Sequence, residues 1–126
     1  MAVLKVFSLN VYGLRDVRKR RQVFQIASKS GHDISFFQET FSLPEDSWAK
    51  EWKGKSLFSS LKSNQGGCAI LFKPHLKVLS SQVDPLGRYI IAKVQRFSQI
   101  LRCATSMLLL CQEIDLYSSL ISYSNF

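Results

Sequence analysis

Two strand ends carry the polar residues whose types and spacing could do chemistry. Asn10 follows an apolar stretch over residues 3–9, and Gln38-Glu39-Thr40 follows a second apolar stretch. Parallel sheets bind ligands at the carboxyl ends of adjacent strands, so Asn10 and Glu39 would meet if these strands are neighbours. A carboxylate there can hold Mg²⁺, which prefers oxygen ligands, and an Asn amide can orient a phosphate. Carboxylates at strand ends are also common without a metal, and the residue types alone favour a solvated Glu39.

The elements that must position these residues follow an α/β order. Apolar and β-branched runs predict strands over residues 3–9, 33–38, 68–72, 76–83 and 88–94. A helix is predicted over residues 17–30, and a shorter one from Pro44 through Trp52 with Ser42 as its cap. Turn residues stand at 64–67 and 84–87. Helix-linked strands followed by hairpins indicate a mixed α/β fold.

The last quarter of the chain differs in character. Ile100 and Leu101 can still belong to a strand, but residues 102–126 contain no Gly, no Pro and no clean hydrophobic period. This tail is compatible with an amphipathic helix or with a pair of strands.

The charge balance favours a polyanionic partner. The chain has 126 residues, which favours one domain, and a formal net charge of +8. Such a charge suits nucleic acid or an anionic membrane surface. Five basic residues crowd the start of the predicted helix, where they would contact phosphates or form a solvated helix face. They are Arg15, Arg18, Lys19, Arg20 and Arg21.

Several classes of protein are excluded or disfavoured. The three cysteines are odd in number and widely spaced, which gives neither a disulfide framework nor a zinc knuckle. No run approaches the ~20 apolar residues of a membrane span. The apolar stretch at the N-terminus is too short for a signal peptide. We therefore expect a protein of the nucleus or cytoplasm that does not cross a membrane.

Four segments in order carry a resemblance to a known family. They are S-L-N-V-Y-G-L, I-S-F-F-Q-E-T, G-G-C-A-I-L-F and D-P-L-G-R-Y-I. Together they resemble the endonuclease domains of LINE-type retrotransposons, in the endonuclease/exonuclease/phosphatase superfamily. The resemblance implies a mixed sheet in a four-layer α/β/β/α sandwich of the DNase-like type. It covers the N-terminal portion of such a domain, residues 1–101, and leaves residues 102–126 unmatched. We expect an incomplete sandwich that exposes a sheet face and self-associates.

The same resemblance implies Mg²⁺-dependent cleavage of phosphodiester bonds in DNA. Glu39 would be the metal-binding carboxylate, Asn10 would help to build the phosphate and metal pocket, and Arg88 would face the DNA. Gly66-Gly67 would start the strand that lines the sheet edge. Tyr12 departs from the family, which has Asn or Asp there.

The family's later segments, N-x-Y-A-P, G-D-F-N and S-D-H, find no match. Neither histidine, His32 or His75, aligns with the catalytic one, so we interpret both as surface residues. The sequence therefore predicts a truncated, catalytically inactive endonuclease domain. Two alternatives stay open: a basic nucleic-acid-binding module without chemistry, and a minimal nuclease in which Glu39, Asp84 or Asp115 converge.

Overall fold

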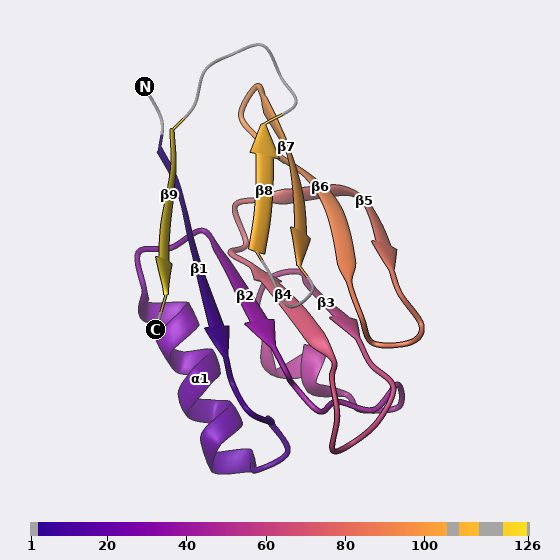
Figure 1. The fold of residues 1–126 in the computed structure, drawn as a ribbon. Coiled ribbons are helices and arrows are strands. Elements are labelled where there is room, and N and C mark those ends of the chain that lie inside the picture. The colour runs from indigo at the N-terminus through magenta and orange to yellow at the C-terminus, as the bar shows by residue number, and fades with distance from the viewer. Residues whose placement is uncertain (1–2, 106–108, 114–119, 126) are drawn as a thin grey trace.

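A computed structural model describes residues 3–105, 109–113 and 120–125 (Figure 1). Nine strands and two helices follow one another in this part of the chain. They are β1 (Val3–Asn10), α1 (Val17–Lys29), β2 (Ile34–Gln38), the 3₁₀ helix η1 (Trp48–Glu51), β3 (Ser56–Ser59), β4 (Cys68–Phe72), β5 (Lys77–Val83), β6 (Ile90–Arg96), β7 (Gln99–Thr105), β8 (Leu109–Glu113) and β9 (Leu120–Asn125).

The strands form two sheets. The first has the order β3-β4-β2-β1-β9, and the second has the order β5-β6-β7-β8. Strand β1 pairs in parallel with β2 and β9, whereas β4 pairs antiparallel with β2 and β3. The first sheet is therefore mixed, which confirms the predicted fold class. The tail contributes β8 and β9, so the strand alternative holds for its described residues.

The two sheets pack face to face around one apolar core. Strands β6 and β7 alternate between buried and more exposed residues, the period that a sheet with one covered face requires. The core residues come from both sheets. They are Leu4, Val6, Ile34, Phe36, Leu57, Cys68, Ile70 and Phe72, with Leu76, Ile90, Ala92, Val94, Leu101 and Cys103.

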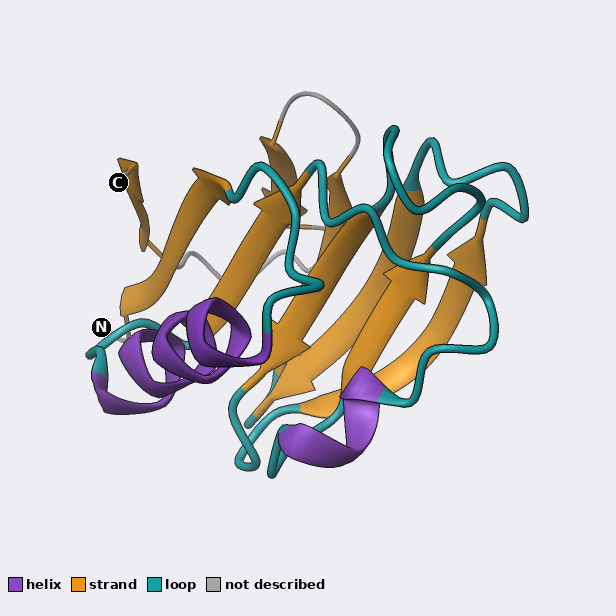
Figure 2. Cartoon of the chain, turned by 90° about the horizontal axis from the view of Figure 1, so that it is seen from below, coloured by secondary structure: helices purple, strands orange, loops and turns teal. Residues whose placement is uncertain are grey.

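The helices cover the other face of the first sheet. Figure 2 shows α1 and η1 on the same side of it. This second apolar cluster comprises Phe7, Val11, Leu14, Val23, Phe24, Ala27, Phe37, Trp48, Trp52, Ala69 and Leu71. Strands β2 and β4 are thus covered on both faces, and every residue in them is buried. This burial explains why their sequences are continuous apolar runs rather than alternating ones.

The described residues form three layers. The helices pack on the first sheet, and the first sheet packs on the second, which is the arrangement expected for an incomplete four-layer sandwich. In this part of the chain no helix covers the outer face of the β5–β8 sheet. That face is mixed rather than apolar, because Lys93 and Arg102 stand on it beside Ile91 and Ile100. Self-association through it stays a prediction. No helix among the described residues has the length and apolar character needed to cross a bilayer.

Local capping explains where α1 begins. Asp16 caps α1 by accepting hydrogen bonds from the backbone N–H groups of Arg18 and Lys19. Its negative charge offsets the basic first turn, which opposes the helix dipole. The prediction of a Ser42 cap is wrong, because η1 begins at Trp48 and Ser42 lies outside it. The Ser42 hydroxyl instead bonds those of Thr40 and Ser60.

Candidate functional site

Asn10 and Glu39 come together at the carboxyl ends of neighbouring strands. Asn10 is the register partner of Gln38 in the parallel β1–β2 pair, and Glu39 is the next residue. The N–H of Val11 donates to the carbonyl of Gln38, 3.0 Å away, so the pairing continues past the strand end. The predicted juxtaposition of these two residues is therefore present.

Backbone hydrogen bonds join four loops at this end of the sandwich. The loops follow β1 and β2, precede β4 and connect β5 to β6. The donor–acceptor pairs are Gly13 N to Glu39 O (2.7 Å), Leu14 N to Thr40 O (2.9 Å), Thr40 N to Gly67 O (3.2 Å), Phe41 N to Gly66 O (3.0 Å) and Gly67 N to Gly87 O (3.1 Å). Loops tied in this way hold their side chains in fixed positions relative to the sheet.

Close approach explains the glycine directly before β4. Gly67 has a φ of +83°, and a Cβ on it would lie 2.6 Å from the Thr40 hydroxyl. A side chain there would therefore push the β2 loop away from the β4 loop. Glycine at this position allows the two loops to share their backbone hydrogen bonds.

Strained backbone is concentrated at the same end. Tyr12, Glu39 and Phe41 have φ values of 50°, 54° and 56°, in the left-handed region. A non-glycine residue in this region costs about 1–2 kcal/mol. Such strain is characteristic of sites where side-chain position matters more than stability. At position 12 the strain is greater for Tyr than it would be for Asn or Asp, which adopt this conformation more readily.

A pocket of about 520 Å³ opens beside Glu39. Its walls come from the β2 end, the segment before β4 and the turn between β5 and β6. They comprise Gln38, Glu39, Leu61, Lys62, Gln65, Gly66, Gly67, Cys68, Leu86, Gly87 and Arg88. Among these lining residues Glu39 is the one carboxylate, and the wall also contains two cations, Lys62 and Arg88. An anionic group such as a phosphate would be compatible with this charge distribution.

Arg88 is fixed by Asp84. The guanidinium Nε donates to Asp84 Oδ2 at 2.7 Å, and the backbone N–H of Arg88 donates to the same oxygen at 3.0 Å. The hydrogen bond from Arg88 holds the pKa of Asp84 below its usual range, and the carboxylate raises the pKa of Arg88. Both groups therefore stay charged, and the cation is oriented at the pocket wall.

A buried polar bridge lies beneath the pocket, and sequence reasoning did not find it. Gln38 Nε2 donates to the Thr105 hydroxyl of the second sheet at 3.3 Å, and the Ser8 hydroxyl donates to Gln38 Oε1 at 3.1 Å. The thiol of Cys68 donates to the Thr105 carbonyl at 3.9 Å, and burial raises the pKa of Cys68 to about 12. The bridge joins residues 67 positions apart, so no local pattern could have indicated it.

The donor set at the strand ends fits Mg²⁺ only in part. Glu39 supplies one carboxylate, and Asn10 Oδ1 already accepts the Tyr12 N–H at 3.1 Å. Among the described residues no group of three His, Cys, Asp or Glu side chains converges. Mg²⁺ commonly binds through one or two carboxylates, waters and phosphate oxygens. A bound ion would therefore depend on water and phosphate for most of its ligands.

The predicted basic cluster divides into residues with different surroundings. Arg20 is only 8% exposed and donates to Glu51 at 2.8 Å and to the Leu14 carbonyl at 2.9 Å. Its guanidinium also stacks on Trp48, 4.8 Å from the ring centroid. Arg20 is therefore a packing residue beneath the helix, and the expectation that it contacts nucleic acid does not fit its burial.

The remaining basic residues stay accessible. Arg15 pairs with Asp46 at 2.9 Å, and the Lys19 ammonium donates to the Tyr12 carbonyl at 3.1 Å. Arg18 and Arg21 are exposed on α1. Arg15, Arg18 and Lys19 lie at the start of α1, on the side where β1 ends.

The histidines lie at the other end of the first sheet. His75 Nε2 is 2.9 Å from Asp33 Oδ1, and Asp33 precedes β2 whereas Glu39 follows it. His32 is not the surface residue that we expected. Its ring meets that of Phe7 edge-on, with 4.8 Å between centroids. Burial, with a smaller effect of two lysines, lowers its pKa.

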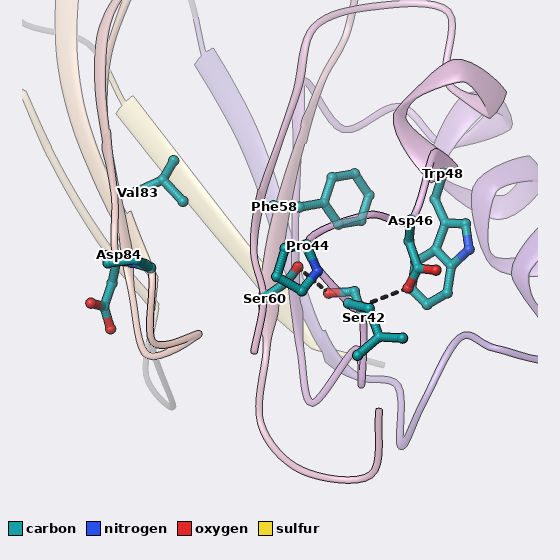
Figure 3. A pocket seen from close by; sticks show the side chains of 10 residues that line it. Ser42, Pro44, Asp46, Trp48, Phe58, Ser60, Val83 and Asp84 are labelled. Carbon is teal, nitrogen blue, oxygen red and sulfur yellow. Dashed lines mark hydrogen bonds between the residues drawn. The ribbon is translucent and has the colours of Figure 1, made fainter. Parts of the chain in front are cut away.

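A second cavity of about 370 Å³ lies between the loop before η1 and the β5–β6 turn. Figure 3 shows its walls, among them Ser42, Phe58 and Ser60. Both of its carboxylates have partners, Arg15 for Asp46 and Arg88 for Asp84. Asp84 therefore points its charge at Arg88 and does not line the Glu39 pocket. Asp115, the other residue of the minimal-nuclease alternative, lies outside the described residues.

Known proteins resemble this chain in sequence and in fold. The sequence model of the endonuclease/exonuclease/phosphatase family matches residues 7–108. A Transposon TX1 uncharacterized 149 kDa protein from Xenopus laevis is 33% identical over 96 residues. That match covers 73% of this chain but only 7% of the relative. The crystal structure of D. rerio TDP2 in complex with single-strand DNA product is similar, with a TM-score of 0.55 and 25% identity. It covers 84% of this chain and 46% of that one.

Proposed function

Because this chain belongs to the endonuclease/exonuclease/phosphatase family, we propose that it is part of a retrotransposon-type DNA endonuclease domain whose Glu39 pocket holds a phosphodiester. The observation that carries the proposal is the pocket itself, in which Glu39, at the end of a parallel strand, shares the wall with the cations Lys62 and Arg88. The D. rerio TDP2 complex, which contains single-strand DNA product, supports nucleic acid as the ligand. The protein then works in the nucleus or cytoplasm, where its substrate is.

Glu39 is the proposed metal ligand, and Asn10 orients the phosphate beside it. When bound, Mg²⁺ would polarise a phosphoryl oxygen and offset part of the negative charge of the phosphate. Arg88, held by Asp84, supplies a fixed positive charge for the phosphate. Arg15, Arg18 and Lys19 extend the basic surface around the start of α1 and contact neighbouring phosphates.

We further propose that this chain binds nucleic acid without cleaving it at a measurable rate. Phosphodiester hydrolysis needs an activated water, stabilisation of the transition-state charge and a protonated leaving group. Glu39, the cations and Mg²⁺ serve the second need. Among the described residues that line the pocket, no histidine and no second carboxylate serves the first or the third.

Nicking of supercoiled plasmid tests the proposal. The protein is incubated with plasmid and Mg²⁺, beside samples with EDTA and with Glu39→Ala, after circular dichroism has shown that each protein is folded. We expect no nicking. Nicking that disappears with EDTA and in Glu39→Ala would show a catalytic pocket and would support the minimal nuclease instead.

Binding separates the metal-dependent site from a basic module without chemistry. Mg²⁺ is expected to strengthen binding of a short oligonucleotide to the wild-type chain but not to Glu39→Ala. Equal behaviour of the two proteins would favour the basic nucleic-acid-binding module. Absence of binding at low salt would contradict both.

A further inference from the structure

A groove of about 250 Å³ opens on the helix layer, apart from the Glu39 pocket. It lies between α1 and η1, which sit side by side on the outer face of the first sheet (Figure 2). Its lining residues are Arg21, Phe24, Gln25, Ser28, Lys29, Glu51, Trp52 and Lys53. The Glu39 pocket, by contrast, opens at the strand ends.

One wall of the groove is a polar stripe on α1. Arg21, Gln25 and Lys29 follow one another at four-residue intervals, which places them on the same face of the helix. All three are exposed. The stripe extends over about 12 Å of the helix axis, at 1.5 Å per residue. Lys53, just beyond η1, provides a cation on the opposite wall.

The charge of the groove is positive. Arg21, Lys29 and Lys53 form no ion pair within the part of the chain that the structure describes. Glu51 is the one carboxylate among the lining residues, and its Oε2 accepts a hydrogen bond from the buried Arg20 at 2.8 Å. Arg20 thus already compensates the charge of Glu51. The three unpaired cations remain available to attract a negatively charged ligand into the groove.

The floor of the groove offers packing surface but no stacking platform. Phe24 and Trp52 meet edge-on, with 6.3 Å between ring centroids, and both are buried. The indole N–H of Trp52 donates to the Phe72 carbonyl at 2.8 Å, which fixes the ring. Bases stack on exposed aromatic faces, and protein interfaces depend on accessible apolar anchors. The groove has neither, so it suits a polyanionic backbone better than bases or an acidic protein.

We propose that this groove binds the phosphodiester backbone of nucleic acid, as a contact separate from the Glu39 pocket. The binding is independent of sequence, because no base edge or base face is read. The argument rests on the charges of the groove and does not require that Glu39 holds a metal.

Two triple variants of equal charge test the proposal. The groove variant carries Arg21→Gln, Lys29→Gln and Lys53→Gln. The control variant carries Lys77→Gln, Lys93→Gln and Arg102→Gln on the β5–β8 sheet, so each loses one Arg and two Lys. Binding of a duplex of about 30 base pairs and arbitrary sequence is measured by fluorescence anisotropy between roughly 50 and 200 mM salt. Over this range phosphate contacts change the affinity strongly. Circular dichroism checks the fold of each protein.

The groove variant is expected to bind about tenfold or more weakly than wild type at the lowest salt. Its slope of log affinity against log salt should fall in magnitude by about 2–3, since each lost phosphate contact removes about 0.9. The control variant should keep most of the wild-type slope, and Glu39→Ala should keep it in the absence of Mg²⁺. Failure of the Mg²⁺ effect alone would therefore overturn the Glu39 proposal and leave the groove intact.

Three results would overturn the groove proposal. Equal loss in the two triple variants would mean that net charge alone governs binding. Absence of duplex binding by the wild-type chain at the lowest salt would remove the ligand. Binding of poly-glutamate that depends on the groove and is at least as tight as duplex binding would identify an acidic protein as the partner.

Discussion

Glu39 shows how one residue can combine a functional group with a strained backbone. Its carboxylate lines the pocket, while its φ of 54° lies in a region that glycine adopts at lower cost. The N–H of Gly13 donates to the Glu39 carbonyl, and the N–H of the next residue, Thr40, donates to the Gly67 carbonyl. These two bonds hold Glu39 in place. The conformation is therefore imposed by tertiary contacts rather than by the preference of a glutamate.

Replacement of Glu39 separates the two properties. Glu39→Gly should be more stable than Glu39→Ala by up to about 1 kcal/mol, because the relief of left-handed strain exceeds the entropy that glycine loses on folding. Both variants should lose any Mg²⁺ dependence of oligonucleotide binding. Urea unfolding of the two proteins gives the comparison, and an alanine variant as stable as the glycine variant would contradict the claim of strain.

Cys68 links the site to pH. Burial raises the pKa of its thiol from about 9 to about 12 in the folded chain. Between these values the unfolded chain has lost the proton and the folded chain retains it, so stability falls as pH rises. The loss between pH 9 and 10.5 should approach about 2 kcal/mol, at about 1.4 kcal/mol per pH unit.

Cys68→Ala provides the comparison for this pH effect. Its absolute stability changes through lost packing, but its stability should fall less steeply than that of wild type above pH 9. Unfolding free energies at several pH values give the two slopes. Parallel slopes would show that Cys68 does not titrate as its burial requires.

At the scale of the elements, α1 depends on its cap. The helix carries four basic residues in its first five positions, which oppose the dipole at a helix N-terminus. Asp16 satisfies two backbone donors there and supplies the opposite charge. The buried Arg20 and the apolar face of the helix then hold it against the sheet.

Asp16→Ala should therefore destabilise the chain by about 1 kcal/mol, the usual effect of removing a helix cap. Asp16→Asn keeps the capping oxygen and removes the charge. The stability that this variant loses relative to wild type should therefore be smaller at high salt, where charges are screened. Thermal unfolding at low and high salt measures both variants. An alanine variant with unchanged stability would mean that packing alone determines the start of α1.

At the scale of the whole molecule, the polar bridge beneath the pocket connects the two sheets. Gln38 of the first sheet and Thr105 of the second meet at a buried hydrogen bond of 3.3 Å. An amide that loses its partner in such a place costs about 1–3 kcal/mol. The bridge thus fixes the sheets relative to each other where the candidate site lies.

Thr105→Val removes the acceptor with little change in volume, and we expect it to destabilise the chain by about 1–3 kcal/mol. Thr105→Ser retains the hydroxyl and should lose only the contribution of a methyl group. Denaturant unfolding compares the two. If Thr105→Ser proved less stable than Thr105→Val, methyl packing rather than the hydrogen bond would be the important contribution of Thr105.

The sequence by itself determined the order of the main elements and the location of the two strand-end residues. Hydrophobic periodicity is a local property, so β1, α1, β2 and β4 could be predicted closely. The short β3 was missed, and the pairing of the tail strands was left open. A strand of four residues carries little periodic signal, and its pairing depends on a distant partner.

Only the tertiary structure decided the surroundings of each charge. The burial of Arg20, the pairing of Arg88 with Asp84 and the bridge from Gln38 to Thr105 depend on side chains that meet through packing. The groove beside Arg21 likewise exists because α1 and η1 pack on the same sheet face. Residue types specify which chemistry a chain can perform. Which charges stay in solvent, and which face a ligand, follows from contacts between elements far apart in the sequence.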